Sequence, residues 1–129
     1  MFKDSKAFSS FSVDDVSAAK QFYGETLELD VEELPEGLAL HIAGGGDVFI
    51  YPSSNYTAPK HTVLNFPVDD IDEAVDELVR RGVRMEHYAM PEITTDERGI
   101  FRGEGDSGPR AIAWFKDPDG HVLSVLQEA

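Results

Sequence analysis

Apolar and polar residues follow a pattern that occurs twice along the chain. The segment FSVDDV, which begins at Phe11, returns 55 residues later as FPVDDI, which begins at Phe66. In each copy an alternating apolar stretch, typical of a strand, leads into two aspartates and then into apolar positions at helical spacing. The repeat therefore predicts two copies of one structural unit, each of which begins with a strand and continues with a helix.

The helical stripe is longest in the second copy. Apolar residues recur there at the spacing of one helix face over 71–79, and Gly82 ends the pattern. The first copy has a shorter stripe over 16–23, which stops near Gly24. One aspartate of each pair is expected to cap the helix that follows, because a carboxylate accepts hydrogen bonds from the first free N–H groups and suits the positive helix end.

After each helix the pattern changes to short strand-like runs bounded by turn residues. These runs cover 29–34, 38–43 and 48–51 in the first half, and 83–88, 111–115 and 122–126 in the second half. Each half thus reads as strand, helix and three strands. The segment 89–110 is rich in glycine, proline and charge, and it is expected to be a lid or binding loop, or else simply mobile.

Half of this chain is too short to bury a full core by itself. We therefore expect a single domain over 1–129, made of a first module over 7–52 and a second module over 60–127. The sequence leaves open whether the two modules pair within one chain or are swapped between two chains. The linker over 52–59, which contains Ser53, Ser54 and Asn55, permits either path.

Composition excludes several partners and several kinds of chemistry. The chain has 25 acidic residues against 11 lysines and arginines, a formal charge of −14, so neither nucleic acid nor an anionic membrane is an expected partner. It has no cysteine, which excludes a disulfide scaffold, a thiolate zinc site and a cysteine nucleophile. Because no signal segment or membrane span is visible, a cytoplasmic protein is expected.

The paired modules, the opening FSVDDVSAAKQFYGETL and the ending WFKDPDGHVLSVLQ together resemble the vicinal oxygen chelate superfamily. This group contains glyoxalase I, the fosfomycin and bleomycin resistance proteins and the extradiol dioxygenases. The resemblance extends from about Ala7 to Gln127. It implies an α+β fold in which two βαβββ modules pair into an incomplete barrel with a U-shaped cavity, and assembly as a homodimer.

The resemblance also implies where metal-dependent members hold a divalent ion, through His and Glu on the first and last strands of both modules. The matching first-strand positions carry Phe8 and Val63, and the last-strand positions carry Ser124 and either Ile50 or Tyr51. None of these is a good ligand for such a cation. The sequence therefore predicts no metal and no other cofactor.

Strand alternation directs a mixture of apolar and polar side chains toward the cavity. The expected ligand-binding residues are Phe8, Ser10, Ser12, His41, Ile50, Asn65, Arg110, Trp114 and Ser124. Trp114 is alternatively a core aromatic residue. His41 is the candidate catalytic residue, because histidine titrates near neutral pH and can act as a general base; a structural role is the alternative. His121 is expected to be solvated.

Charged residues of the long loop form a further candidate site. Glu97, Arg98, Arg102 and Arg110 are candidates to close over a ligand, with the arginines binding a carboxylate or phosphate. A solvated loop is the alternative.

The resemblance supports two main functions. The first is metal-independent binding of a small organic molecule in the cavity between the modules; the bleomycin-resistance branch implies a cationic drug, which the charge of −14 would attract. The alternative is a metal-dependent glyoxalase-type lyase or isomerase, or a dioxygenase, with displaced ligands such as His41 and His61. A metal-free enzyme with His41 as base and Arg110 as oxyanion or carboxylate partner is a third reading, so the sequence does not decide whether the protein is an enzyme.

Overall fold

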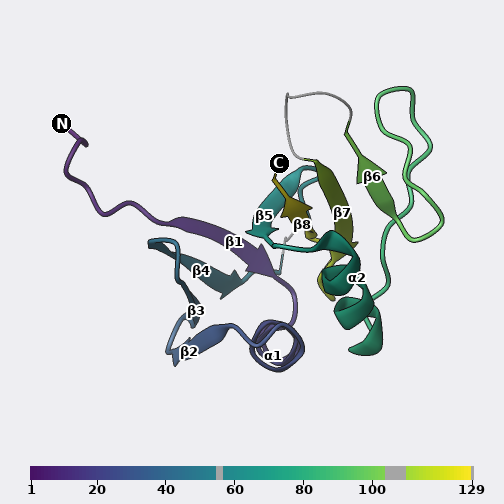
Figure 1. The fold of residues 1–129 in the computed structure, drawn as a ribbon. Coiled ribbons are helices and arrows are strands. Elements are labelled where there is room, and N and C mark those ends of the chain that lie inside the picture. Colours follow the sequence, from purple (N-terminus) through teal and green to yellow (C-terminus); the bar gives the residue numbers. More distant parts are fainter. Residues whose placement is uncertain (55–56, 104–109, 129) are drawn as a thin grey trace. The chain divides into compact units, whose positions relative to one another are not determined.

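The computed structural model describes residues 1–54, 57–103 and 110–128, and Figure 1 shows its helices and strands. The chain divides into two compact units, Met1–Ala58 and Pro59–Ala129. Each unit has a helical segment after its first strand and one four-stranded sheet, which confirms two βαβββ modules of an α+β fold. Within the described residues, no helix is long and apolar enough to span a membrane.

The first unit is built on a sheet with the strand order β1-β4-β3-β2. Its elements are β1 (Ser9–Val13), α1 (Val16–Lys20), the π-helical η1 (Gln21–Thr26), β2 (Asp30–Leu34), β3 (Gly37–Ile42) and β4 (Gly46–Pro52). β1 runs parallel to β4, and the remaining pairs are antiparallel. The β3–β4 turn includes Gly45 at φ 111°, a backbone conformation that favours glycine.

The helical segment of the first unit begins at the predicted place and continues two residues past Gly24. Asp15 caps α1, since its Oδ1 accepts a hydrogen bond from the Ala18 N–H at 3.1 Å. The stop predicted near Gly24 falls at Thr26, where η1 ends. The N–H of Leu27 donates to the Phe22 carbonyl oxygen at 2.9 Å, five residues back, so a wider turn carries the helix past the glycine.

One face of the first sheet packs against the helix. The buried residues of this core are Val13, Ala19, Tyr23, Leu38, Leu40, Val48 and Ile50. The strand registers place Ile50 opposite Leu38, and Val48 opposite Leu40, so these side chains share one face. The opposite face carries the intervening residues.

The second unit repeats this arrangement with the strand order β5-β8-β7-β6. Its elements are β5 (Thr62–Pro67), α2 (Ile71–Arg80), β6 (Ile100–Arg102), β7 (Ala111–Lys116) and β8 (Val122–Gln127). Asp70, at the same position of the repeat as Asp15, caps α2 by accepting from the N–H groups of Asp72 at 3.0 Å and Glu73 at 3.2 Å. The helix packs against β7 and β8 over Val75, Phe115 and other buried residues.

The strand expected over 83–88 is not a strand in the structure. Met85 makes only an isolated bridge with Phe115. The strand that pairs with β7 at this edge is β6, which lies in the segment predicted to be a loop. Both segments therefore lie along the same edge of β7. β6 pairs with the first half of β7, where Ile100 lies opposite Ala113, and Met85 bridges to Phe115 in the second half. Part of the expected loop, 104–109, lies outside the described residues, as does Asn55 of the linker.

The expected solvation of His121 is also wrong, because this residue is 1% exposed. Its Nδ1 lies 3.0 Å from Oδ2 of Asp117, whose side chain is also buried. Asp117 Oδ1 accepts further hydrogen bonds from the N–H groups of His121 at 2.8 Å and Asp119 at 3.0 Å. The carboxylate thus organises the β7–β8 turn and provides the histidine with a buried partner.

Candidate functional site

The face of the first sheet that carries no helix combines aromatic rings with hydroxyl groups. Cross-strand register places Ser10 beside Phe49 and Ser12 beside Tyr51. The rings of Phe49 and Tyr51 are stacked, with centroids 5.8 Å apart and planes inclined by 19°. A flat apolar surface with hydroxyl groups along one side is suited to the ring system of a small organic molecule.

A groove of about 900 Å³ lies on this face. Its lining includes Phe8, Ala39 and Phe49, with Asp47 and Lys6 as charged members. Phe8 is 65% exposed, although it is a large apolar residue. The groove is therefore mainly apolar and carries one charge of each sign.

Ile50, expected to face the ligand, lies on the other face of the sheet. It is 0% exposed and belongs to the core beneath the helix. In the internal repeat Ser10 corresponds to Asn65, and the residues opposite these two are Phe49 and Ser124. The counterpart of Ser124 is therefore Phe49, which sequence reasoning missed.

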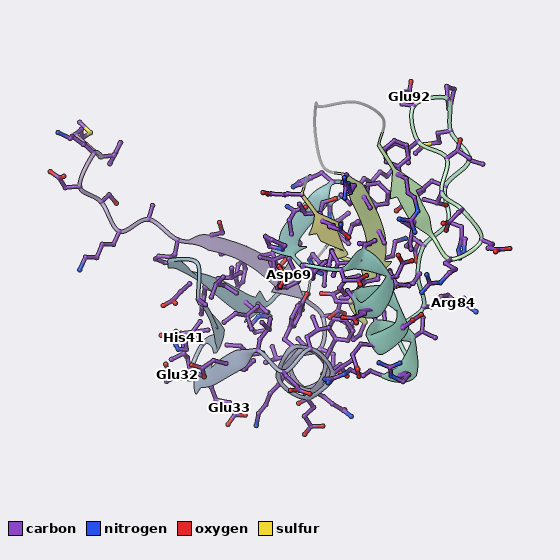
Figure 2. All side chains as sticks on the ribbon, in the orientation of Figure 1. Glu32, Glu33, His41, Asp69, Arg84 and Glu92 are labelled. Carbon is purple, nitrogen blue, oxygen red and sulfur yellow. The ribbon has the colours of Figure 1, made fainter. Side chains whose placement is uncertain are left out.

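His41 lies on the face of the first sheet that carries no helix, and it contacts the carboxylates of Glu32 and Asp47. Figure 2 labels His41 and Glu32 at this place. Its Nδ1 is 3.0 Å from Asp47 Oδ1, and its Nε2 is 2.9 Å from Glu32 Oε1. The hydrogen bond with Asp47, followed by that with Glu32, raises the pKa of His41 above its usual value. Both ring nitrogens are engaged, so this geometry favours a structural imidazolium over a general base, which needs an accessible lone pair.

We call the face of the second sheet that carries no helix its open face. It carries a hydroxyl–amide pair beside an indole ring. Ser124 Oγ donates a hydrogen bond to Asn65 Oδ1 at 2.6 Å, across the register of β5 and β8. Trp114 is the register partner of Ser124 on β7, so the three side chains share one face. Ser124 is 0% exposed and Trp114 is 9% exposed, whereas Asn65 is exposed.

Tyr88, which the sequence did not indicate as a site residue, extends the aromatic part of this face. Its ring packs edge-on against Trp114, with centroids 5.4 Å apart and planes inclined by 78°. Burial, together with the nearby charge of Glu86, raises the pKa of Tyr88. Hydrogen bonds with Thr95, including a 2.9 Å bond from the Thr95 N–H to the Tyr88 carbonyl oxygen, hold this backbone in place.

Two arginines of the predicted binding loop are engaged with α2. Arg98 donates to Asp72 Oδ1 at 2.6 Å and also pairs with Asp76. Arg102 donates to the same Asp72 oxygen at 3.0 Å. These contacts attach the segment around β6 to the helix, so in this arrangement the two guanidinium groups have a structural role.

No described contact joins Glu97, Arg110 or His61 to these two arginines. Glu97 accepts a hydrogen bond from His87 Nε2 through its carbonyl oxygen at 3.0 Å. Arg110 is exposed immediately before β7, and its N–H donates to the Gln127 carbonyl oxygen at 2.9 Å. His61 is exposed immediately before β5.

The residues present do not fit a divalent metal ion. Phe8 has no donor atom, and Val63, at the irregular start of β5, has none either. Ser124 uses its hydroxyl proton on Asn65, and a neutral hydroxyl is a weak ligand compared with a carboxylate or imidazole. Among the described residues, no group of three or more histidine and acidic side chains is arranged to hold a metal.

Comparisons with known proteins agree with this architecture. The family model described as Glyoxalase/Bleomycin resistance protein/Dioxygenase superfamily matches residues 8–125. No curated protein matches the chain in sequence.

Several solved structures share the fold along nearly the whole chain. A glyoxalase family protein from Enterococcus faecalis has a TM-score of 0.67 and 23% identity, covering 98% of this chain and 99% of its own. An antibiotic binding protein from Streptomyces sp. CB03234 has a TM-score of 0.63 and 24% identity, covering 95% and 96%. A fosfomycin resistance protein from Listeria monocytogenes has a TM-score of 0.67 and 13% identity, covering 95% and 92%.

Proposed function

Because the chain belongs to the Glyoxalase/Bleomycin resistance protein/Dioxygenase superfamily, we propose that it binds a small organic molecule without a metal ion. The binding surface is a sheet face that carries no helix, and each unit has one such face. The observation that carries this proposal is the composition of those faces, where stacked or edge-packed aromatic rings adjoin uncharged hydrogen-bonding groups.

The aromatic pairs support a planar ligand. Phe49 and Tyr51 offer a stacked surface, and Tyr51 remains 39% exposed. Aromatic side chains provide large contact areas at a low cost in conformational entropy, so this ring pair, of which Phe49 lines the groove, favours binding of a flat molecule. Ser10 and Ser12, on the neighbouring strand, supply hydroxyl groups that can orient it.

The solved neighbours support a small-molecule ligand as a class. Two of them are described as an antibiotic binding protein and a fosfomycin resistance protein. Their identities to this chain are 24% and 13%, so what they share with it is the fold. The proposal therefore specifies a small organic molecule, and no particular drug.

The charges of the first unit refine the expectation of a cationic ligand. The chain carries a formal charge of −14, which attracts cations at long range. At the groove, however, Asp47 is paired with His41, and Lys6 contributes a positive charge. Local pairing thus reduces the preference for a cation, so neutral and cationic compounds both belong in a ligand screen.

The test is a thermal-shift screen of planar neutral, cationic and anionic compounds. A ligand at about 100 times its Kd adds about 2.7 kcal/mol to the stability of the folded state, which raises the melting temperature by several degrees. Phe49→Ala should reduce this shift, whereas Phe2→Ala, at a ring 76% exposed outside the groove, should not. Absence of any shift across the three classes would contradict the proposed function.

A further inference from the structure

We propose that Asn65 selects the ligand through hydrogen bonding. Its side-chain amide, oriented by Ser124, donates to a carbonyl oxygen of an uncharged planar molecule held on the open face of the second sheet. This inference rests on the proposed function and adds the chemical class of the ligand.

The orientation of the amide follows from its contact with Ser124. The buried hydroxyl of Ser124 donates to Asn65 Oδ1 at 2.6 Å. A buried hydroxyl without a partner is costly, so this bond holds the amide oxygen toward Ser124. The amide nitrogen then lies at the other end of the planar group, and its two N–H bonds are directed away from Ser124.

Asn65 is thus a preorganised donor. The residue is exposed although its neighbour across the strands is fully buried. A donor that is already fixed in direction loses little conformational entropy when a ligand oxygen binds to it. The two N–H bonds of the amide can only donate, so an acceptor on the ligand is their complementary group.

The surroundings favour an uncharged, planar ligand. Trp114, Ile112, Leu126 and Pro67 share this face by strand alternation. Within the described residues of β5, β7 and β8, its one charged member is Lys116, which pairs with Glu86 at 3.6 Å.

Arg110, immediately before β7, is also cationic. Because Lys116 is paired with Glu86, neither sign of charge has a strong partner on this face, and an ion of either sign would lose its hydration against the apolar side chains. A neutral carbonyl compound avoids this cost.

The direct test uses 9-fluorenone and fluorene, two planar molecules that differ by one carbonyl oxygen. Trp114 is the only tryptophan of the chain, so quenching of its fluorescence reports binding at this face. A net gain typical of one hydrogen bond predicts that fluorenone binds about fivefold more tightly than fluorene.

Variants separate the donor from the rest of the face. Asn65→Asp keeps an acceptor for Ser124 but removes both N–H donors, so fluorenone affinity should fall about fivefold or more while fluorene affinity stays within about twofold. Ser124→Ala keeps the amide but frees its orientation, and it should cause a smaller loss. Asp69→Asn is the control, because it exchanges the same two groups at an exposed residue outside this face.

The outcomes distinguish the inference from the proposed function. Equal affinity for both probes, or fluorenone binding that Asn65→Asp leaves unchanged, would overturn the role of Asn65 and leave the binding function intact. Binding of other screened compounds but of neither probe would also overturn this inference alone. If no compound of the three classes bound, the proposed function would fail and the inference with it.

Discussion

Asp47 is the direct cross-strand partner of His41, and its Oδ1 lies 3.0 Å from Nδ1 of the His41 ring. Glu32, on the other neighbouring strand, engages Nε2 of the same ring at 2.9 Å. Together they connect β2, β3 and β4 at the edge of the groove that Asp47 lines. The cluster therefore couples the protonation of one histidine to the charge beside a candidate ligand site.

The first prediction is that His41 titrates above the usual histidine pKa of 6.5. Asp47→Asn should lower this pKa more than Glu32→Gln, because the hydrogen bond with Asp47 is the larger cause of the rise. A histidine side-chain NMR titration of the three proteins provides the measurement. A His41 pKa at or below 6.5 in the unchanged protein would contradict the cluster.

The same shift gives the pH dependence of stability. Because the folded-state pKa is raised, the cluster stabilises the fold fully below pH 6.5 and loses this contribution as pH rises through the folded pKa. The difference in melting temperature between the unchanged protein and His41→Ala should therefore be larger at pH 6 than at pH 9. His61→Ala, at an exposed residue outside the cluster, serves as the control.

The second prediction concerns the N-terminal cap of α2. Asp70→Ala should lower the free energy of unfolding by about 1 kcal/mol, because two N–H groups of α2 lose their acceptor. Asp69→Ala, its neighbour in the aspartate pair, should change it by less than about 0.5 kcal/mol. Urea unfolding provides the comparison, and equal effects of the two variants would argue against Asp70 as the cap.

The third prediction is that Arg98 holds the segment around β6 to α2. Arg98→Met removes the contacts with Asp72 and Asp76, and amide hydrogen exchange over 94–100 should accelerate. The melting temperature should change little, because these charges are partly exposed. Arg84→Met, at the exposed position labelled in Figure 2, is the matched control. Unchanged exchange in Arg98→Met would show that the ion pairs do not restrain the segment.

The fourth prediction concerns the buried carboxylate of the β7–β8 turn. Asp117→Ala should destabilise the protein by about 3 kcal/mol or more, because the buried His121 ring and two N–H groups lose their partner. Glu128→Ala, at an exposed residue just after β8, should have little effect. Denaturant unfolding compares them, and a loss below about 1 kcal/mol would contradict a structural role for the pair.

The fold was largely predictable because it depends on local patterns. The apolar stripe and paired aspartates of each repeat predict both helices, and their caps are Asp15 and Asp70. The prediction of a strand over 83–88 failed for a nonlocal reason. Met85 and Ile100 both lie beside β7, and which segment pairs along that edge depends on how the long connection returns to it.

The candidate site was less predictable because it depends on strand register. Counting from the turn glycines placed Ile50 in the site, but the two hairpin connections differ, with 43–45 in one and 117–121 in the other. A shift of one residue moves a side chain to the opposite face. The carboxylates around His41 likewise become neighbours only once β2, β3 and β4 are aligned.

The most direct test of metal-independent binding is elemental analysis of freshly purified protein, with melting curves in the presence and absence of Mn, Fe, Ni, Zn and a chelator. Metal-independent binding predicts no stoichiometric metal and no change in melting temperature with any of these additions. The same preparation should respond to at least one compound of the thermal-shift screen. Stoichiometric metal that raises the melting temperature and is removed by the chelator would contradict metal-independent binding and favour a metal-dependent enzyme of the family.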